Sequence, residues 1–249
     1  MSELVSVITP TYNCADFIVS TIESVQKQTY ENWEMIIVDD CSTDRTKEIV
    51  ERIAKNDNRV RYYCLDKNSG AAVARTKAME LANGEYMAFL DSDDIWLPNK
   101  LELQLEFMKK NNYSFSGTAY EQIDEDGNLL GKIIKIPKKV DYNRLLLDCP
   151  VGNSTVMYSV KDMGKFKVPN IRKRNDDALW LTMLKKEKYI HGMPDVLMRY
   201  RIRKNSISSN KFKVIKYHWI LYRDIEHLSF VRSAFHVCYW CLIKVLHIK

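Results

Sequence analysis

The first ninety residues alternate between short apolar runs and segments in which apolar residues recur at helical spacing. The apolar runs and one alternating segment predict strands over 4–8, 33–38, 59–65 and 86–90. The segments between them predict helices over 15–28, over 43–54 and from the turn at 68–70 to residue 81. Four strand-then-helix units in series predict a parallel sheet with helices on both faces and right-handed crossovers.

The pattern continues less regularly beyond residue 97. It predicts a helix over 98–110, strands over 113–123 and 129–136 joined by a turn at 124–128, a strand over 154–158, a helix over 176–186 and a strand over 196–202. Leu179, Trp180 and Leu184 are expected to face the core. We therefore divide residues 1–210 into halves, 1–97 and 98–210, and treat 211–249 as a helical tail.

Polar side chains follow three of the predicted parallel strands. The clusters are Thr9–Asn13, Asp39-Asp40 and Asp91–Asp94. The carboxyl ends of parallel strands share one edge of a sheet, and ligands of open α/β sheets bind there. The three acids of the last cluster repel one another unless a cation lies among them, and carboxylate oxygens suit Mg²⁺ or Mn²⁺. The alternative is a solvated turn that caps the next helix.

The same strand ends exclude two common nucleotide sites. No G-x-G-x-x-G follows the first strand, the side chains of Thr9–Asn13 keep a pyrophosphate from the backbone, and a P-loop is absent. Carboxylates would bind a diphosphate through a metal ion instead. Asp39 or Asp40 is able to accept a hydrogen bond from a base or a ribose hydroxyl. The alternative is capping of the following helix, for which Ser42 is the expected N-cap.

A second acidic cluster, Asn175-Asp176-Asp177, stands at the start of the helix predicted over 176–186. Helix starts favour acids through the macrodipole, so capping is one interpretation. The three basic residues before the cluster, 172–174, would hold a phosphate and keep a neighbouring Asp ionised, as a general base requires.

Charge separates the tail from the rest of the chain. The net charge is +6, and residues 199–249 hold 11 Lys and Arg against Asp224 and Glu226. No basic n-region or long apolar segment follows Met1, so we expect no signal peptide and a cytosolic protein with reduced thiols. Cys238 and Cys241 have no second pair beside them, which favours apolar filling of a helix face over zinc binding.

Aromatic and basic residues interleave along the tail, 211–249. The 11 residues between Arg232 and Lys244 are uncharged, which is shorter than the ~20 apolar residues of a membrane span. Such a composition suits a helix that lies in the interface of an anionic membrane. The alternative is a helical cap on the preceding domain, or a homodimer contact.

Five segments resemble, in this order, the motifs of family 2 glycosyltransferases: Thr9–Asn13, Val38–Asp44, Asn68–Arg75, Leu90–Asp94 and Asn175–Trp180. The resemblance covers roughly residues 4–210. It implies a GT-A fold, which is an α/β, mostly parallel sheet flanked by helices, here with a C-terminal helical tail. It also implies a nucleotide-sugar donor and inverting transfer.

The resemblance implies a donor pocket in the first half. Pro10, Tyr12 and Asp40 would line the nucleoside pocket, with Asp40 bound to the base. Arg75 would lie near the nucleoside or order its loop.

The resemblance also implies the residues closest to the reaction. Asp91, beside Ser92 in the donor site, would contact the ribose or a metal-bound water, and Asp93 would bind Mg²⁺ or Mn²⁺. Asp176 would deprotonate the acceptor hydroxyl.

Two positions depart from the family pattern. Asn175 stands where the family usually has Glu, and Arg203 stands where relatives often have His. Arg203 is unsuited to bind a metal ion, but its guanidinium is able to pair with phosphate oxygens. The further candidates for phosphate or acceptor contacts are therefore Arg174, Asp177, Arg201 and Arg203.

We therefore expect an inverting glycosyltransferase that moves a sugar from a UDP-sugar to a polyprenyl-diphosphate-linked glycan in O-antigen or capsule synthesis. It would act at the cytoplasmic membrane surface and would bind no nucleic acid. One alternative is a sugar nucleotidyltransferase, although such enzymes carry a Gly-rich loop with a basic residue after the first strand. Another is a nucleic-acid- or membrane-binding module that uses the tail, which deletion of 211–249 would distinguish.

Overall fold

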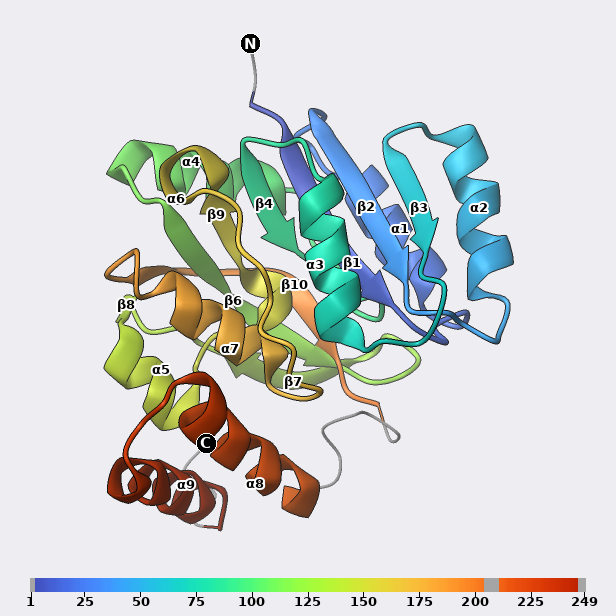
Figure 1. The fold of residues 1–249 in the computed structure, drawn as a ribbon. Coiled ribbons are helices and arrows are strands. Elements are labelled where there is room, and N and C mark those ends of the chain that lie inside the picture. Colours follow the sequence, from blue (N-terminus) through green and yellow to red (C-terminus); the bar gives the residue numbers. More distant parts are fainter. Residues whose placement is uncertain (1–2, 204–210, 246–249) are drawn as a thin grey trace.

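The computed structural model describes residues 3–203 and 211–245. A ten-stranded mixed sheet has the order β3-β2-β1-β4-β9-β6-β10-β5, with β7 paired to β6 and β8 to β10 (Figure 1). The strands are β1 (Val5–Thr11), β2 (Trp33–Asp39), β3 (Val60–Cys64), β4 (Tyr86–Phe89), β5 (Ile95–Trp96), β6 (Phe115–Ile123), β7 (Leu129–Ile134), β8 (Lys139–Val140), β9 (Met157–Ser159) and β10 (Ile190–Arg201).

Strands β1 to β4 are parallel, as the sequence predicts. Asp39, at the end of β2, pairs with Thr11 at the end of β1 and with Cys64 at the end of β3. These strand ends therefore lie along one edge of the sheet. β9 is antiparallel to both β4 and β6, so β6 and β10 run in the same direction as the first four strands.

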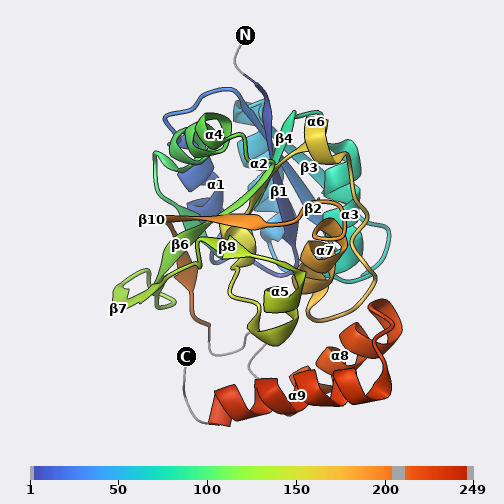
Figure 2. The same cartoon turned by 90° about the vertical axis from the view of Figure 1, so that its left-hand side faces the viewer.

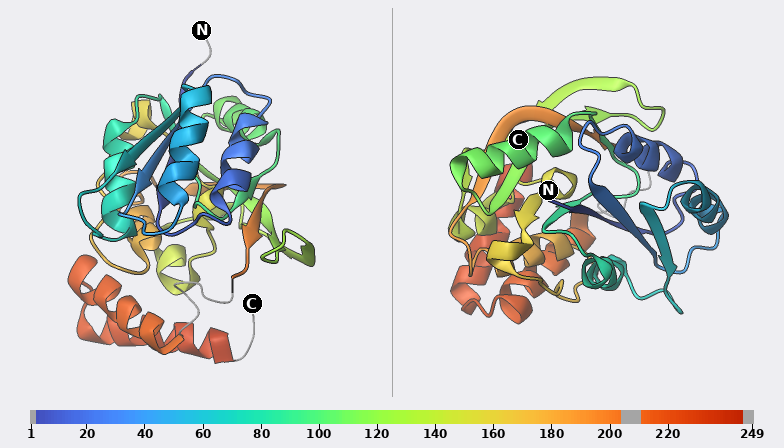
Figure 3. Two further views of the ribbon diagram at one scale, coloured as in Figure 1. Left: turned by 90° about the vertical axis from the view of Figure 1, so that its right-hand side faces the viewer. Right: turned by 90° about the horizontal axis from the view of Figure 1, so that it is seen from above.

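Side chains of the central strands alternate between two apolar cores. Met35 and Ile37 of β2 pack into one core, and Ile36 and Val38 pack into the other. Burial on both faces explains why these strands are nearly continuous apolar runs. The first core is covered by α1 (Ile18–Gln26), α2 (Thr46–Asn56) and α4 (Lys100–Asn111), and the second by α3 (Ala71–Leu81) and α7 (Asn175–Met183) (Figure 2, Figure 3).

Helices α1 and α2 begin three residues later than the sequence predicts. The segments before them are tied to each other, because the backbone N–H of Asn13 donates to Ser42 Oγ and that of Thr43 donates to Asn13 Oδ1, both at 2.8 Å. Asp44, and not Ser42, accepts a hydrogen bond from the backbone N–H of Thr46 at the helix start (2.9 Å). The prediction of Ser42 as the N-cap is therefore wrong.

The structure contains short elements that the sequence does not predict, all but β5 in the second half. They are α5 (Tyr142–Asp148), α6 (Val160–Met163), β5 and β8, and a 3-10 turn at Asn153–Thr155 precedes β9. β10 begins at Ile190, six residues before the predicted start. Pro194 lies within a shift of the β6–β10 register and hides the first part of this strand in the sequence. Leu179, Trp180 and Leu184 are buried, as predicted.

The tail forms α8 (Lys211–Ile220), a π-helical turn (Leu221–Ile225) and α9 (Phe230–Val245), which lie below α5 in Figure 2. The hydroxyl of Tyr222 donates to the carbonyl of Leu146 (2.9 Å), and the buried carboxylate of Glu226 pairs with Lys185 (2.9 Å). One face of the tail thus packs on the rest of the protein, in agreement with the helical-cap interpretation.

The opposite face of α9 is apolar and exposed. Val231, Phe235, Cys238 and Leu242 recur at intervals of four, three and four residues and form one stripe, which we name the outer stripe. Val231 is 76%, Phe235 58% and Leu242 57% exposed. None of the helices within 3–203 and 211–245 has the length and hydropathy required to cross a bilayer. The division of the chain at residues 97 and 210 stays a prediction.

Candidate functional site

Asp40 ties together the carboxyl edge of the first strands. Its two carboxylate oxygens accept hydrogen bonds from the backbone N–H groups of Ser69 (2.6 Å) and Gly70 (2.7 Å). Gly70 has a φ of +94°, which glycine adopts without steric cost at this turn into α3. Asp40 is only 3% exposed and holds the loop before α3, while the base contact that the sequence predicts for it stays a prediction.

Pro10, Tyr12 and Asp39 lie at the same edge. Pro10 is buried at the end of β1, whereas Tyr12 is 48% exposed and leaves its ring open to a ligand. Asp39 is fully buried and accepts hydrogen bonds from Ser42 Oγ (2.6 Å) and the hydroxyl of Tyr62 (2.7 Å). Asp39 is therefore structural, which distinguishes two adjacent acids that are equivalent in the sequence.

Arg75 connects three of the motifs. Arg75 is 4% exposed, and its guanidinium reaches from α3 to Asp91, beyond the end of β4, at 2.9 Å (Nη2 to Oδ1). It also donates to the side-chain oxygen of Asn175 at the start of α7. Asn153 Nδ2 donates to the same oxygen of Asp91 (2.8 Å). A single buried cation thus fixes a strand end and a helix start relative to each other.

The three acids after β4 differ in accessibility. Asp94 is 1% exposed and accepts hydrogen bonds from Ser154 Oγ (2.6 Å) and from the backbone N–H of Arg201 (3.0 Å). The side chains of Asp91 and Asp93 are 34% and 24% exposed. Ser92 is buried, and its carbonyl accepts from Thr21 Oγ1 (3.0 Å). A ligand is therefore able to reach Asp91 and Asp93, while Asp94 stabilises the fold.

The first turn of α7 carries Asp176 and Asp177. Asp177 is 2% exposed and pairs with Arg174, whose φ of +64° lies in the left-handed region. This buried pair commits each residue to the other, which differs from the predicted phosphate or acceptor contacts of Arg174 and Asp177. Asp176 is only partly buried and stays accessible at the helix start.

Arg201 is also committed to the fold. It is 6% exposed, and its guanidinium donates to the carbonyls of Asp93 (2.9 Å) and Glu125 (2.8 Å). These bonds occupy Nε and Nη1 of Arg201, and the phosphate contact that the sequence predicts for this residue stays a prediction. Arg201 joins β10 to the turn between β6 and β7, and Arg203 is the arginine that pairs with Asp93, at 3.0 Å.

Carboxylates from two distant motifs share this site. Desolvation of the partly buried carboxyl raises the pKa of Asp91 to about 6 although Arg75 opposes the rise, and the charges of Asp93 and Asp176 add to it. Burial and the charges of Asp93 and Asp91 also raise the pKa of Asp94 well above its usual value. The four acids therefore create a concentrated negative charge that a divalent cation would neutralise.

Such a cation fits the donor set. No closed group of three or more acid, His or Cys ligands occurs in the part of the chain that the structure describes. Mg²⁺ does not require one, because it is commonly held by one or two carboxylates together with water and substrate phosphates. Asp91 and Asp93 offer such carboxylates at an accessible strand end.

Two residues of this site are missed by sequence analysis. Asn153 and Ser154 bond to Asp91 and Asp94, and Ser154 Oγ also accepts from the backbone N–H of Asp91 (3.0 Å). The available signal is a short polar run ahead of an apolar strand, which is too common a pattern to single out these residues.

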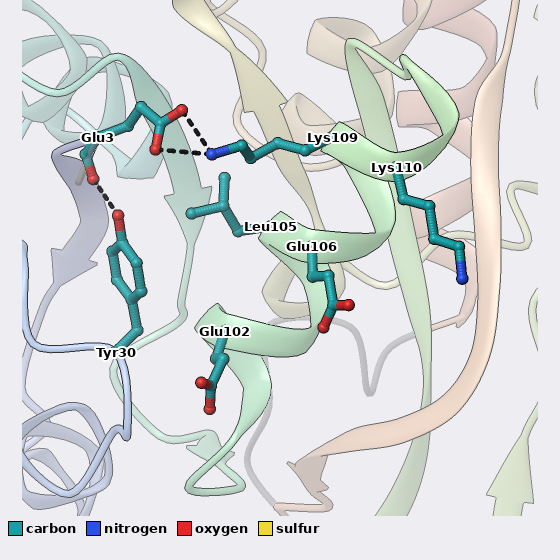
Figure 4. A pocket seen from close by; sticks show the side chains of 7 residues that line it. All are labelled: Glu3, Tyr30, Glu102, Leu105, Glu106, Lys109 and Lys110. Carbon is teal, nitrogen blue, oxygen red and sulfur yellow. Dashed lines mark hydrogen bonds and ion pairs between the residues drawn. The ribbon is translucent and has the colours of Figure 1, made fainter. Parts of the chain in front are cut away.

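A separate pocket of about 410 Å³ is lined by Glu3, Tyr30 and residues of α4 (Figure 4). The carboxylate of Glu3 pairs with Lys109 (2.8 Å), and its carbonyl accepts from the hydroxyl of Tyr30 (2.5 Å). Glu3 precedes β1 and Tyr30 precedes β2, so this pocket lies at the amino ends of the strands, opposite the cluster of acids.

The family follows from comparison with known proteins. The model of the family described as "Glycosyl transferase family 2" matches residues 6–168, which is more than half of the chain. The chain belongs to this family. It is a glycosyltransferase, which confirms the resemblance seen in the motifs and decides against the nucleotidyltransferase and binding-module alternatives.

Relatives within the family cover nearly the whole chain. TuaG of Bacillus subtilis (strain 168), whose name assigns it to teichuronic acid biosynthesis, is 48% identical over 241 residues, or 97% of this chain and 94% of TuaG. WfgD of Escherichia coli is 41% identical over 222 residues, or 89% of this chain and 86% of WfgD. WfgD is named a UDP-Glc:alpha-D-GlcNAc-diphosphoundecaprenol beta-1,3-glucosyltransferase.

Solved glycosyltransferase structures share the fold. Residues 1–349 of S. aureus TarS in complex with UDP-GlcNAc superimpose with a TM-score of 0.71 at 19% identity, covering 96% of this chain and 72% of TarS. The mannosyltransferase PcManGT of Pyrobaculum calidifontis, in complex with GDP-Man and Mn²⁺, gives a TM-score of 0.65 at 19% identity, covering 90% of this chain and 64% of PcManGT. The expected GT-A fold, with a sheet between helices and a C-terminal helical tail, is confirmed.

Proposed function

We propose that this glycosyltransferase moves a sugar, with inversion, from a UDP-sugar to a hydroxyl of a lipid-diphosphate-linked glycan in bacterial surface polysaccharide synthesis. The observation that carries the proposal is the convergence of Asp91 and Asp93 with Asp176, which Arg75 joins through Asp91 and the neighbouring Asn175. Asp93, which would bind the donor's metal ion, and Asp176, which would accept the acceptor's proton, then belong to one site.

In the proposed reaction, the acceptor hydroxyl oxygen attacks the anomeric carbon from the side opposite the diphosphate. The new carbon–oxygen bond forms as the bond to UDP breaks, and the hydroxyl proton passes to Asp176. General base catalysis of this kind is typically worth ~10²–10⁴-fold in rate. A single displacement inverts the anomeric configuration. Asp177 is unavailable for this role because it is buried against Arg174.

The donor half of the proposal rests on the edge formed by β1, β2 and α3. The exposed ring of Tyr12 would stack on or border the base, and the buried residues Pro10 and Asp40 would line the same nucleoside pocket. Support for uridine comes from WfgD and WfaP of Escherichia coli, both named as UDP-Glc-dependent glucosyltransferases, and from the TarS complex with UDP-GlcNAc.

Asp93 would hold Mg²⁺ or Mn²⁺, with Asp91 beside it on the ribose or a coordinated water. The ion, when bound, would neutralise charge that grows on the leaving diphosphate. The residues of this chain supply the rest: Arg75 keeps Asp91 oriented, and Arg201 and Ser154 fix the backbone of the acidic segment.

The lipid-linked acceptor would be used at the membrane surface. WfgD and WfaP are named for acceptors on diphosphoundecaprenol, a lipid. The outer stripe of α9 would enter the interface of an anionic cytoplasmic membrane, and the positive charge of residues 199–249 would be attracted to its lipids. The inner face of the tail meanwhile keeps the catalytic domain attached.

A screen of nucleotide sugars tests the function. The full chain would be incubated with Mn²⁺, one donor at a time and a GlcNAc-diphosphate-lipid acceptor, with release of nucleoside diphosphate as the readout. We expect release from a UDP-sugar, dependence on the acceptor, loss of release in EDTA, and a product with inverted anomeric configuration by NMR. The proposal would be contradicted if none of the donors released nucleoside diphosphate, or if the product retained the anomeric configuration.

A further inference from the structure

Arg203 has a defined place in this protein. Its Nη1 lies 3.0 Å from Asp93 Oδ2, and its guanidinium lies 4.8 Å from the ring centroid of Phe17. The paired side chains are 28% and 24% exposed, so the pair stands at the surface of the site and not inside the protein. The acid best suited to bind a metal ion therefore already has a cation beside it.

The chain around Arg203 is anchored, while its side chain is long. Two residues earlier, the backbone N–H of Arg201 donates to Asp94 (3.0 Å), and its guanidinium lies 5.0 Å from the same Phe17 ring. This anchor keeps the backbone of Arg203 close to the acids. The guanidinium of Arg203 itself is held by a partly exposed ion pair and a ring, contacts that are individually worth little.

A divalent cation and Arg203 would need the same carboxylate. Arg75 already pairs with Asp91, and Asp94 is engaged by Ser154 and by the backbone of Arg201. A metal ion that binds Asp93 would thus displace the side chain of Arg203. The released guanidinium would find a new anion in the donor diphosphate, because its planar fork matches phosphate oxygens.

We propose that Arg203 is an exchangeable counter-ion of Asp93, which it neutralises in the donor-free enzyme and leaves for the diphosphate when metal and nucleotide bind. This inference rests on the proposed donor and metal roles of Asp93. In the absence of nucleotide, the metal ion binds weakly because Arg203 pairs with Asp93. Nucleotide raises the metal affinity because its diphosphate binds Arg203 and frees Asp93. Metal and nucleotide affinities are then coupled, and the coupling is reciprocal.

Mn²⁺ binding to the full chain, followed by the EPR signal of free Mn²⁺, tests the exchange with and without UDP. For Arg203→Met, we expect Mn²⁺ alone to bind about two- to fivefold more tightly than in wild type, the range for losing a partly exposed ion pair. We also expect UDP to bind more weakly in the presence of Mn²⁺, so that UDP raises Mn²⁺ affinity less than it does in wild type. Arg203→Lys keeps the positive charge but lacks the planar guanidinium. It should weaken UDP binding, while the affinity for Mn²⁺ in the absence of UDP stays near that of wild type.

Arg199→Met is the matched control. Arg199 lies on β10 and pairs with Glu121 at 2.8 Å, with exposures of 37% and 20% that resemble those of the Arg203–Asp93 pair. It should leave both affinities unchanged. Equal Mn²⁺ affinity in wild type and Arg203→Met, or undiminished UDP binding in that variant, would overturn the exchange. Failure of the proposed function is distinguishable, because it would appear as absent sugar transfer while these binding differences persisted.

Discussion

The buried guanidinium of Arg75 donates a hydrogen bond to the side-chain oxygen of Asn175, one hundred residues further along the chain. Asn175 stands where the family usually has Glu, and its amide oxygen accepts this bond without adding a charge to the cluster of Asp91, Asp93, Asp94 and Asp176. The contact fixes the start of α7, and hence Asp176, relative to the donor acids. It thus accounts for how two motifs become one site.

Asn175→Ala should therefore lower both stability and activity. Removing the acceptor leaves a buried N–H of Arg75 unsatisfied, which typically costs about 1–3 kcal/mol of unfolding free energy. We expect kcat to fall more than KM for the donor rises, because Asp176 loses its fixed position. Urea denaturation and steady-state kinetics measure the two effects. Asn143→Ala, at an exposed site on α5, serves as the control, and wild-type values for Asn175→Ala would argue against this role.

Asp176→Asn should abolish transfer and spare the fold. Loss of the general base predicts a fall in kcat of ~10²–10⁴-fold, with UDP binding in Mn²⁺ unchanged. Asp177→Asn should instead lower stability, because Arg174 would lose its buried carboxylate. Thermal unfolding and UDP titration separate the two neighbours. Asp195→Asn, on an exposed residue, should behave as wild type, and full transfer by Asp176→Asn would remove it as the base.

Lys100 predicts a pH dependence of stability. It is fully buried, its Nζ donates to Gln104 Oε1 (2.6 Å), and burial lowers its pKa to about 7. In the unfolded chain this lysine binds a proton below about pH 10.4. Between these pKa values the unfolded state holds more protons, so this group makes the unfolding free energy rise with pH by up to about 1.4 kcal/mol per unit.

Lys100→Met should remove that contribution. Urea denaturation across the same pH window would show a smaller rise with pH for the variant than for wild type. Lys110→Met, which changes an exposed lysine on the same helix, should keep the wild-type slope. Parallel profiles for wild type and Lys100→Met would mean that Lys100 does not titrate in this range.

Negative charge on the outer stripe should weaken membrane binding. Burying an apolar side chain is worth about 1.5–3 kcal/mol when complete, so Val231→Asp with Phe235→Asp should weaken binding to vesicles containing phosphatidylglycerol by about tenfold or more. Vesicle co-sedimentation measures this effect. Leu129→Asp with Leu130→Asp adds the same two charges at exposed apolar residues of β7 and should bind as wild type. Undiminished binding of the double variant would assign the outer stripe to another partner.

The sequence by itself determined the parallel half of the sheet, the strand ends that carry polar clusters, and the family. These features are local: an apolar run buried on both faces, or a motif of neighbouring residues, is visible without knowing the fold. The end of the strand at 86–90 indicated the acidic cluster Asp91–Asp94, and the family resemblance singled out Asp91 and Asp93 within it.

The tertiary structure alone decided how those residues are shared between fold and site. Asp39 and Asp40 are adjacent, yet Asp39 is fully buried against Tyr62 and Asp40 holds the Ser69–Gly70 loop. Arg201 and Asp177 are buried and bonded within the fold, whereas Arg203 and Asp176 stay accessible. Burial and long-range pairing decide between these roles, and both depend on which segments meet in space. A sequence pattern records neighbours along the chain, so it leaves these choices open.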